Sequence, residues 1–335
     1  MDWNGGYTAS YYGCYVDAGT WRDLDRFEII SGSISKGSND LRESADITTT
    51  DYDETRERWI RIYLDAEQNG DIAHQPLFTG LATSPSKDMT GNLEQHKMTI
   101  YSVLKPAEDI LLERGWYAPA GTSGAELIQD LLEVLPAPVT ISGNAPKLTN
   151  SIVAEDGETC LSMSEKILQA INWRIVIEGD GTITLESKPT SFVVMFDANS
   201  KDVVEPQITV SKDWFSCPNV FRAVSEDNTA VAEDVTGSYL SIEGRGRKVM
   251  VEELNAETAE NESLQEYAER RLAEEQQVQK TASYSRCYLP EIHVTDIVNF
   301  HYEQLTGDFI VTEQKITLDH KATVNEEVVQ YGQDR

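Results

Sequence analysis

Residues 263–275 read Ser263-Leu-Gln-Glu-Tyr-Ala-Glu-Arg-Arg-Leu-Ala-Glu-Glu, and they open the stretch, residues 261–330, that decides the predicted fold. Ser263 and Glu266 have the spacing of a capping box, and the apolar residues recur on one side, which predicts an amphipathic helix. Segments rich in β-branched and aromatic residues follow, and they predict strands over residues 281–288, 296–302, 309–318 and 323–330. Between the second and the third, Leu305-Thr-Gly-Asp-Phe predicts a hairpin turn. This stretch therefore predicts a capped helix followed by a β-meander, without a catalytic pattern.

The first hundred residues also predict short strands separated by polar turns. The clearest strands are Trp59-Ile-Arg-Ile-Tyr-Leu, Pro76-Leu-Phe-Thr-Gly-Leu-Ala-Thr and Lys97-Met-Thr-Ile-Tyr-Ser-Val-Leu-Lys. Residues 27–35 predict a further strand, and the segment that begins at Asp40 predicts a strand or a loop. Several strands at such short spacing favour a small β-barrel or a sandwich.

The composition changes after Pro106, where helical patterns begin. Thr122 or Ser123 is a candidate cap for a helix over residues 124–135, which Pro136 and Pro138 would end. A second helix is predicted over residues 160–172. It leads into a hairpin whose turn is Gly179-Asp-Gly.

The predicted fold class is mainly β with an α+β insertion. We expect two tube-type β-barrel domains separated by a smaller α+β lobe. The expected boundaries are 1–105 for the first β-domain, 106–200 for the lobe and 201–335 for the second β-domain. The second β-domain would carry a polar insertion at 226–260, and an acidic run over residues 252–262 would precede the terminal helix.

Charge is the unusual feature of the composition. The 335 residues contain 28 Lys and Arg against 57 Asp and Glu, which gives a net charge of −29. Such a chain repels phosphate backbones and anionic lipid, so we expect no stable nucleic-acid binding. No apolar run approaches the ~18 residues of a membrane helix, so no integral membrane segment is expected. The N-terminus lacks the pattern of a secretory signal, and four scattered cysteines without CxxC spacing predict free thiols in a reducing cytosol.

A search for catalytic patterns yields no candidate site. The five histidines form no HExxH motif, and no GxSxG, Walker or GxGxxG pattern occurs in the sequence. His293 and His301 stand eight positions apart on the predicted meander, where ordinary sheet residues are the favoured interpretation over a ligand pair. With 57 acidic residues, chance supplies any chosen carboxylate pair, so none is nominated for glycoside hydrolysis. We therefore predict no catalytic, cofactor-binding or metal-binding residues, no cofactor and no enzymatic activity.

Three further motifs each have two interpretations. Glu178-Gly-Asp-Gly-Thr-Ile-Thr-Leu-Glu resembles part of an EF-hand loop, but aligning Gly181 places Val176 and Ser187 where acidic ligands belong. A plain hairpin turn is favoured there. Gly244-Arg-Gly-Arg-Lys suits an anion or partner contact, although a solvated loop tip is favoured. The N-terminal tyrosines (Tyr7, Tyr11, Tyr12 and Tyr15) suit an interface patch or a local core equally well.

Three stretches together resemble the baseplate hub, or tail tip hub, proteins of tailed bacteriophages. This is the late control protein D-like family, also found in defective prophages and contractile injection systems. The first stretch is Phe27-Glu-Ile-Ile-Ser-Gly-Ser-Ile-Ser with the segment Asp40-Leu-Arg-Glu-Ser-Ala-Asp-Ile that follows it. The second is Ile171-Asn-Trp-Arg-Ile-Val-Ile-Glu-Gly-Asp-Gly, and the third is the terminal helix with Ile292-His-Val-Thr-Asp-Ile-Val-Asn-Phe and Gly307-Asp-Phe-Ile-Val-Thr. Pro76-Leu-Phe-Thr-Gly and Gly307-Asp-Phe-Ile-Val-Thr could be corresponding strand starts of two similar domains.

The resemblance implies a virion structural protein that forms a homotrimer. Each chain would supply two tube-type domains, so that three chains form a pseudo-hexameric ring. That ring would join the tail tube, or a distal tail protein, to a spike or tip protein below it. The C-terminus of the tape-measure protein would lie in the lumen, through which DNA passes during genome ejection. The implied location is the virion tail, after synthesis in the cytoplasm of the bacterial host.

Two other functions stay open, namely a tail-associated peptidoglycan hydrolase and a receptor- or carbohydrate-binding tail tip protein. Relatives often carry such activities on an additional domain, and we expect none after Arg335. The resemblance also suggests a role for the negative charge of the chain. A trimer would carry a net charge of 3 × −29, or −87. An acidic lumen would keep DNA from adhering as it passes.

Overall fold

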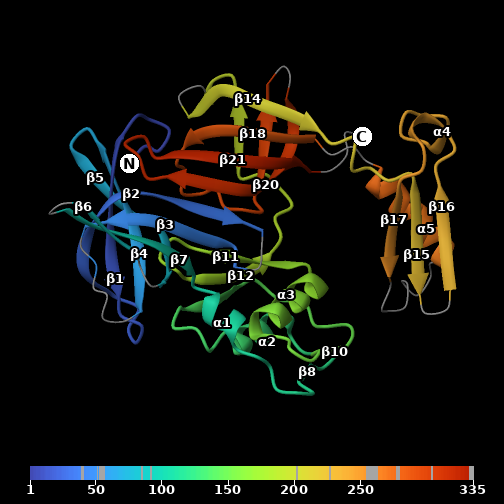
Figure 1. Ribbon diagram of the computed structural model, residues 1–335, viewed down its shortest axis with the longest axis horizontal. Coiled ribbons are helices and arrows are strands. Elements are labelled where there is room, and N and C mark those ends of the chain that lie inside the picture. Colours follow the sequence, from blue (N-terminus) through green and yellow to red (C-terminus); the bar gives the residue numbers. More distant parts are fainter. Residues whose placement is uncertain are drawn as a thin grey trace. The chain divides into compact units, whose positions relative to one another are not determined.

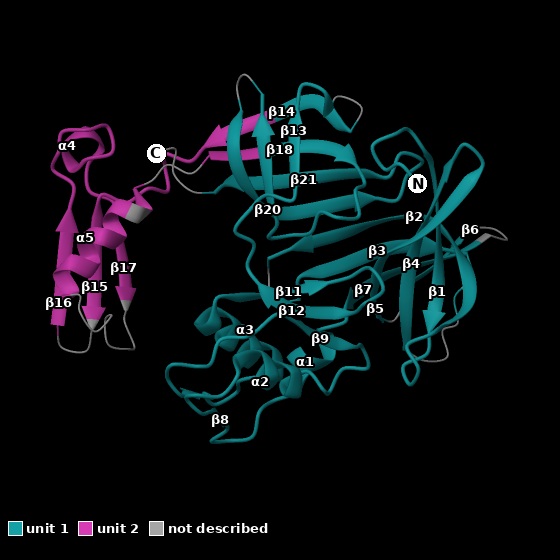
Figure 2. Ribbon diagram, turned by 180° about the vertical axis from the view of Figure 1, so that it is seen from behind, with its two compact units in different colours: residues 1–208, 283–335 teal, residues 209–282 magenta. Residues whose placement is uncertain are grey.

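The computed structural model describes residues 1–38, 41–50, 52, 57–83, 86–90, 93–200, 203–225, 228–253, 263–276, 280–302 and 305–331. By its internal contacts the chain divides into two compact units (Figure 2). Unit 1 comprises Met1–Ile208 and Ser283–Arg335, and unit 2 comprises Thr209–Ala282. The predicted boundaries at residues 105 and 200 fall inside unit 1, and the three-domain division stays a prediction.

The first group of strands in unit 1 forms a closed ring of pairings. In spatial order they are β1 (Thr8–Val16), β4 (Arg58–Gln68), β5 (Asp71–Ala82), β7 (Leu93–Ser102), β3 (Glu43–Thr49) and β2 (Asp23–Gly37). Each is antiparallel to the next, and β1 also pairs with β2, so that the series returns to its start. β6 (Ser86–Thr90) pairs with β7 at the side.

Alternation of side chains explains why these residues form strands. Ile60, Ile62 and Leu64 on β4 point inward and are fully buried, while the residues between them are polar or aromatic. Pro76, which was expected to start a strand, lies within β5 at a register shift opposite Ile62 and Tyr63. A bulge tolerates proline there because the ladder hydrogen bond is already interrupted. Asp40 lies outside the described residues, and β3 confirms the strand interpretation for the segment after it.

The second group of strands continues the same sheet from β2. It consists of β20 (Thr306–Thr317), β21 (Thr323–Gln330), β18 (Lys280–Cys287), β14 (Val204–Lys212), β19 (Ile297–His301) and β13 (Val194–Asp197). The long β20 pairs with β2 through Glu313–Thr317, with β19 through Thr306–Ile310, and with β21 along most of its length. All four predicted strands are present, and β19, β20 and β21 form a meander, whereas β18 pairs with β21 and not with β19. β20 begins at Thr306, so the last four residues of the predicted turn Leu305-Thr-Gly-Asp-Phe belong to a strand. Mainly β character with a large antiparallel sheet is therefore confirmed (Figure 1).

The α+β lobe lies within unit 1. Its elements are α1 (Lys105–Asp109), β8 (Tyr117–Ala118), α2 (Gly124–Leu131), β9 (Val139–Ser142), β10 (Ile152–Val153), α3 (Cys160–Ile171), β11 (Trp173–Ile177) and β12 (Ile183–Ser187). Thr159 and Ser162 form the capping box of α3, and Asn172 in the left-handed conformation ends that helix. α2 ends at Leu131, four residues before the predicted end, because Pro136 and Pro138 preclude further helical turns. Figure 1 shows α2 and α3 beside β11 and β12.

Unit 2 is a three-stranded sheet covered on one face by a helix. The sheet order is β16 (Asn228–Glu233), β15 (Val220–Ser225) and β17 (Val249–Glu253), and the helices are α4 (Ile242–Arg245) and α5 (Leu264–Glu275). Phe221 and Ala223 pack against Ala268 and Leu272 of α5. Ser263 and Glu266 exchange the hydrogen bonds of the predicted capping box. The described part of the predicted polar insertion thus contains β16, α4 and β17, whereas residues 254–262 lie outside the described part.

Candidate functional site

No metal-binding or membrane-spanning feature occurs in the described part of the chain. Its His, Cys, Asp and Glu side chains form no group of three or more that could hold a metal ion. Its four cysteines form no disulfide, and no described helix is long and apolar enough to cross a membrane. His293 lies in the loop before β19, whereas His301 is the exposed last residue of that strand. His301 is thus a sheet residue, as expected, whereas His293 is not.

The hairpin turn at residues 178–182 fastens the lobe to the first group of strands. β11 and β12 pair antiparallel. The turn between them is closed by two backbone hydrogen bonds: the Glu178 amide donates to the Thr182 carbonyl, and the Gly181 amide donates to the Glu178 carbonyl. This confirms the hairpin interpretation over the EF-hand one. The backbone carbonyls of the turn face β4 and β5. Thr79 Oγ1 on β5 donates to the Gly179 carbonyl at 2.8 Å, and Arg61 Nη2 on β4 donates to the Asp180 carbonyl at 2.8 Å.

The turn fits so closely that glycine is required at its tip. A Cβ atom on Gly179 would lie 2.0 Å from the carbonyl oxygen of Pro76. Gly181 has a φ of +82°, and a Cβ there would lie 2.8 Å from the Trp21 ring. The Trp21 indole donates to the carbonyl of Asp180 at 3.0 Å. The Gly179-Asp-Gly sequence therefore allows the chain to turn and also allows the turn to pack closely against Pro76 and Trp21.

Arg61 is the polar anchor of this junction. It is buried on β4, and its guanidinium donates to Thr79, to the Asp23 carboxylate at 2.6 Å and to the carbonyl of Asp180. Planar guanidinium suits such a set of convergent acceptors because its donors have fixed directions.

A second cluster of charges joins the hairpin to the loop before β19. His293 lies 3.4 Å from Glu178 and 3.6 Å from Asp296, and Arg174 lies 2.8 Å from Asp296 and 2.6 Å from Glu186. Burial alone would lower the pKa of His293, but hydrogen bonds with Asp296 and Glu178 raise it to about 9. The hydrogen bond from His293 also holds the pKa of Glu178 below its usual range. At neutral pH this histidine is therefore a cation held between two carboxylates.

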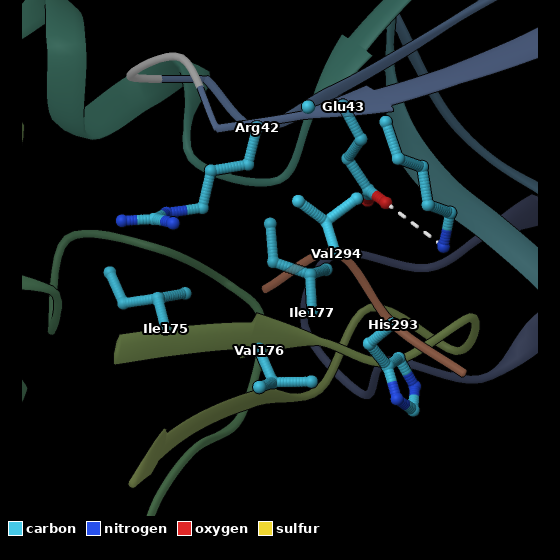
Figure 3. A pocket seen from close by; sticks show the side chains of 9 residues that line it. Arg42, Glu43, Ile175, Val176, Ile177, His293 and Val294 are labelled. Carbon is cyan, nitrogen blue, oxygen red and sulfur yellow. Dashed lines mark ion pairs between the residues drawn. The ribbon is translucent and has the colours of Figure 1, made fainter. Parts of the chain in front are cut away.

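Lys36 and Glu43 form a third polar pair beside a small cavity (Figure 3). Their nitrogen and oxygen atoms are 3.3 Å apart, and burial raises the pKa of Glu43 to about 7 despite the ammonium group. Ile175, Ile177 and Val294 are among the other residues that line the cavity, whose volume is about 30 Å³. That volume suits a single water-sized molecule and is far below the few hundred Å³ of a substrate pocket.

A fully buried charge network lies in the second group of strands. Arg286 Nη2 on β18 donates to Glu326 Oε1 on β21 at 2.5 Å, and Gln314 on β20 donates to the same carboxylate at 2.6 Å. The Tyr284 hydroxyl donates to the other carboxylate oxygen, and burial raises the pKa of that phenol. The carboxylate is thus satisfied by donors from two neighbouring strands, which pins their register.

Similarity to solved structures covers almost the whole chain. A tail protein from Neisseria meningitidis MC58 matches with a TM-score of 0.66 at 14% identity, covering 98% of each chain. The 43 kDa tail protein of prophage MuSo2 from Shewanella oneidensis matches with 0.68 at 11% identity, covering 96% of each. Prophage tail protein gp18 from Listeria monocytogenes EGD-e matches with 0.53 at 12% identity, covering 96% of this chain and 94% of that one. The chain has the fold of phage tail proteins.

This finding confirms, at the level of fold, the resemblance predicted from the sequence. No protein-family model matches the sequence, and no curated protein sequence is similar to it. The phage tail fold therefore persists at identities where the sequence itself carries little detectable signal.

The two remaining sequence motifs also find their places in this tail-protein fold. Tyr7, Tyr11 and Tyr15 pack against the core of the first group of strands, and Tyr12 stacks on Tyr63 with ring centroids 5.0 Å apart. The local-core interpretation of the N-terminal tyrosines is thus confirmed. Within Gly244-Arg-Gly-Arg-Lys, the side chains of Arg245 and Lys248 donate to backbone carbonyls of residues 214–217, so the motif is more than a solvated loop tip.

Sequence reasoning missed the buried charges, although a signal for them exists. Val324, Glu326 and Val328 occupy alternate positions of β21 and all are buried. Tyr284 and Arg286 stand on the inward side of β18 in the same way. A charged residue at an apolar position of a strand pattern indicates an internal partner on a neighbouring strand.

Proposed function

We propose that the chain is a structural, non-enzymatic hub subunit of a tail tip or baseplate, in a phage or a phage-derived injection device. The observation that carries the proposal is the match to solved tail proteins along nearly the full length of both chains. The geometry agrees, because the polar clusters in unit 1 are engaged in joining elements. Such clusters make a rigid building block and leave no cavity of substrate size beside His293 or Glu43.

The proposed assembly is a homotrimer that forms a pseudo-hexameric ring. One chain has two groups of strands joined by the β2–β20 pairing. These would supply two tube-type domains, and three copies would supply six. The ring would connect the tail tube or a distal tail protein to the tip or spike. The tape-measure C-terminus would lie in its lumen until DNA passes. The location would accordingly be the virion tail.

The charge supports passage of DNA rather than its retention. Three chains carry 3 × −29, or −87, and carboxylates that face the lumen would repel phosphate groups. The lumen hypothesis requires exposed acidic residues on the inner wall. An assembled ring whose bore is neutral or basic would contradict it.

Sedimentation over a concentration series tests the stoichiometry. The expected species has three times the chain mass of 37.5 kDa, or 112.5 kDa. A monomer at every concentration would overturn the ring proposal. Turnover of purified peptidoglycan that is lost on changing one carboxylate would overturn the non-enzymatic part separately.

A further inference from the structure

Unit 2 presents three exposed aromatic side chains at one end of its sheet. Trp214, Phe215 and Tyr239 are 45%, 84% and 69% exposed, and we call them the aromatic corner. The rings of Trp214 and Tyr239 meet edge to face with centroids 6.3 Å apart. A cluster of exposed aromatic rings is costly in water and marks a surface that another molecule covers.

The aromatic corner is held in place by the residues beneath it. Asn219 is fully buried, and its amide donates to the carbonyls of Leu240 and Gly246 while accepting from the amide of Lys248 at 2.7 Å. The Asp213 carboxylate accepts from the amide of Ser216 at 3.0 Å and shapes the turn that carries Phe215. The loops are therefore fixed, and the rings are displayed on a preorganised frame.

The rim of the aromatic corner is positively charged. Lys248 lies 4.4 Å from the centroid of the Phe215 ring, Lys212 lies 5.9 Å from that of Trp214, and Arg245 donates to the Trp214 carbonyl at 2.7 Å. Within the described ranges, none of these three cations makes an ion pair. Lys248 interacts electrostatically with the Asp213 carboxylate, so the positive charge of Lys212 and Arg245 is what is available to an external carboxylate, in a chain whose net charge is −29.

The open face of the unit 2 sheet adjoins this rim along β17. α5 covers the other face, and Val231, Val249 and Val251 are 37%, 48% and 54% exposed. Val231 and Val251 flank Arg222 in register, and Val249 directly follows Lys248. A partner seated on the corner would therefore find apolar surface beside it.

We propose that the aromatic corner is a docking surface for a second copy of this chain, on which it receives an acidic surface of that copy. This rests on the proposed function, since it requires copies to assemble. Charge complementarity selects the occupant, because strongly acidic subunits repel one another except where a basic patch meets carboxylates. Aromatic rings beside arginine are also the usual anchors of protein interfaces. The groups beside the rings are cations, so a neutral sugar is the less suitable occupant.

Photocrosslinking from position 215 tests the proposal in the full-length protein. A benzophenone amino acid in place of Phe215 is expected to give covalent dimers, with the crosslink mapping to an acidic segment of the second copy. Lys212→Glu should lower the yield by about threefold, the size of one exposed charge contact, and Lys212→Arg should preserve it. Circular dichroism melts of these variants show whether the fold is retained.

The outcomes separate this proposal from the ring proposal. A ring that forms while position 215 gives no crosslink between copies contradicts the docking surface and leaves the proposed function intact. Crosslinked dimers without a ring contradict the proposed function and support the surface. Saturable quenching of tryptophan fluorescence by peptidoglycan fragments, lost in Trp214→Ala, would assign the corner to carbohydrate and overturn the docking surface.

Discussion

Arg286 and Glu326 lie on neighbouring strands with their side chains 1% and 0% exposed. Removing two opposite charges from water is costly, and mutual attraction offsets that cost only when other donors complete the carboxylate. Here Tyr284 and Gln314 supply those donors. The network therefore favours one alignment of β18, β21 and β20, because a slip of one residue would bring its members to opposite faces.

Replacing one member of this pair should destabilise unit 1 strongly. We expect Arg286→Met to lower the free energy of unfolding by about 3–5 kcal/mol, because the Glu326 charge would lose its counter-ion in a buried site. The double variant Arg286→Met with Glu326→Gln should recover part of the loss. Lys97→Met, at an exposed pair with Asp88, is the matched control and should cost at most about 1 kcal/mol. Urea titrations measure these values, and equal losses in the two single variants would contradict the account.

At the scale of elements, the hairpin formed by β11 and β12 acts as the fastening between the lobe and the first group of strands. Its turn combines close backbone approach at Gly179 with hydrogen bonds from Arg61, Thr79 and Trp21. The cation of His293 ties Glu178 in the turn to the loop before β19, and Arg174 near the base of the hairpin pairs with Asp296 of that loop. The hairpin is thus held at its tip and at its base.

A methyl group at the tip of this hairpin tests the fastening. Gly179→Ala places a Cβ atom against the Pro76 carbonyl, and we expect a loss of about 1–3 kcal/mol through overpacking. Gly6→Ala is the control, since a Cβ there meets nothing within 4 Å. Thermal melts should show a lowered midpoint for the first variant only. An unchanged midpoint for Gly179→Ala would show that the tip does not hold the lobe.

The attachment of the hairpin turn to the loop before β19 should respond to pH through His293. Its pKa in the folded chain is raised from 6.5 to about 9, so its contribution is complete below pH 6.5 and disappears as the pH rises through 9. Burial raises the pKa of Glu43 to about 7, so its own loss of stability is largely over by pH 8. Between pH 8 and pH 10 the wild type should therefore lose about 1.4 kcal/mol more stability than His293→Gln, because about one pKa unit of the raised range lies above pH 8. His301→Gln is the control, and parallel pH profiles for wild type and His293→Gln would refute the assignment.

Local signals predicted many elements, whereas distant pairings could not be predicted from them. Alternation around Trp59-Ile-Arg-Ile-Tyr-Leu indicates β4, and the Ser263 and Glu266 spacing indicates α5, because these patterns are properties of neighbouring residues. The β2–β20 pairing joins residues 33–37 to residues 313–317, and no local pattern specifies such a partner. The packing of the Gly179 turn against β4 and β5 could not be predicted either, since an Asp-Gly turn has the same sequence whether it lies in solvent or against other strands.

At the scale of the whole molecule, unit 2 begins within β14 and ends within β18. These two strands pair with each other, and the hydroxyls of Ser211 and Thr281 are 2.5 Å apart. The chain therefore enters and leaves unit 2 at adjacent points. Such geometry is typical of an inserted domain whose removal leaves the parent sheet intact.

Excision of unit 2 should therefore leave unit 1 folded. We expect a chain in which a short Gly-Ser loop replaces residues 213–279 to show one cooperative unfolding transition, because the described core of unit 1 lies outside that range. Circular dichroism and calorimetry measure this. Non-cooperative melting would show that unit 1 depends on unit 2 for its core.

Negative-stain electron microscopy of the purified full-length protein tests the proposed assembly. We expect end-on class averages of a ring with a central hole, threefold in symmetry and with six similar lobes around the hole. Compact solid particles of single-chain size, without a hole at any concentration, would contradict it.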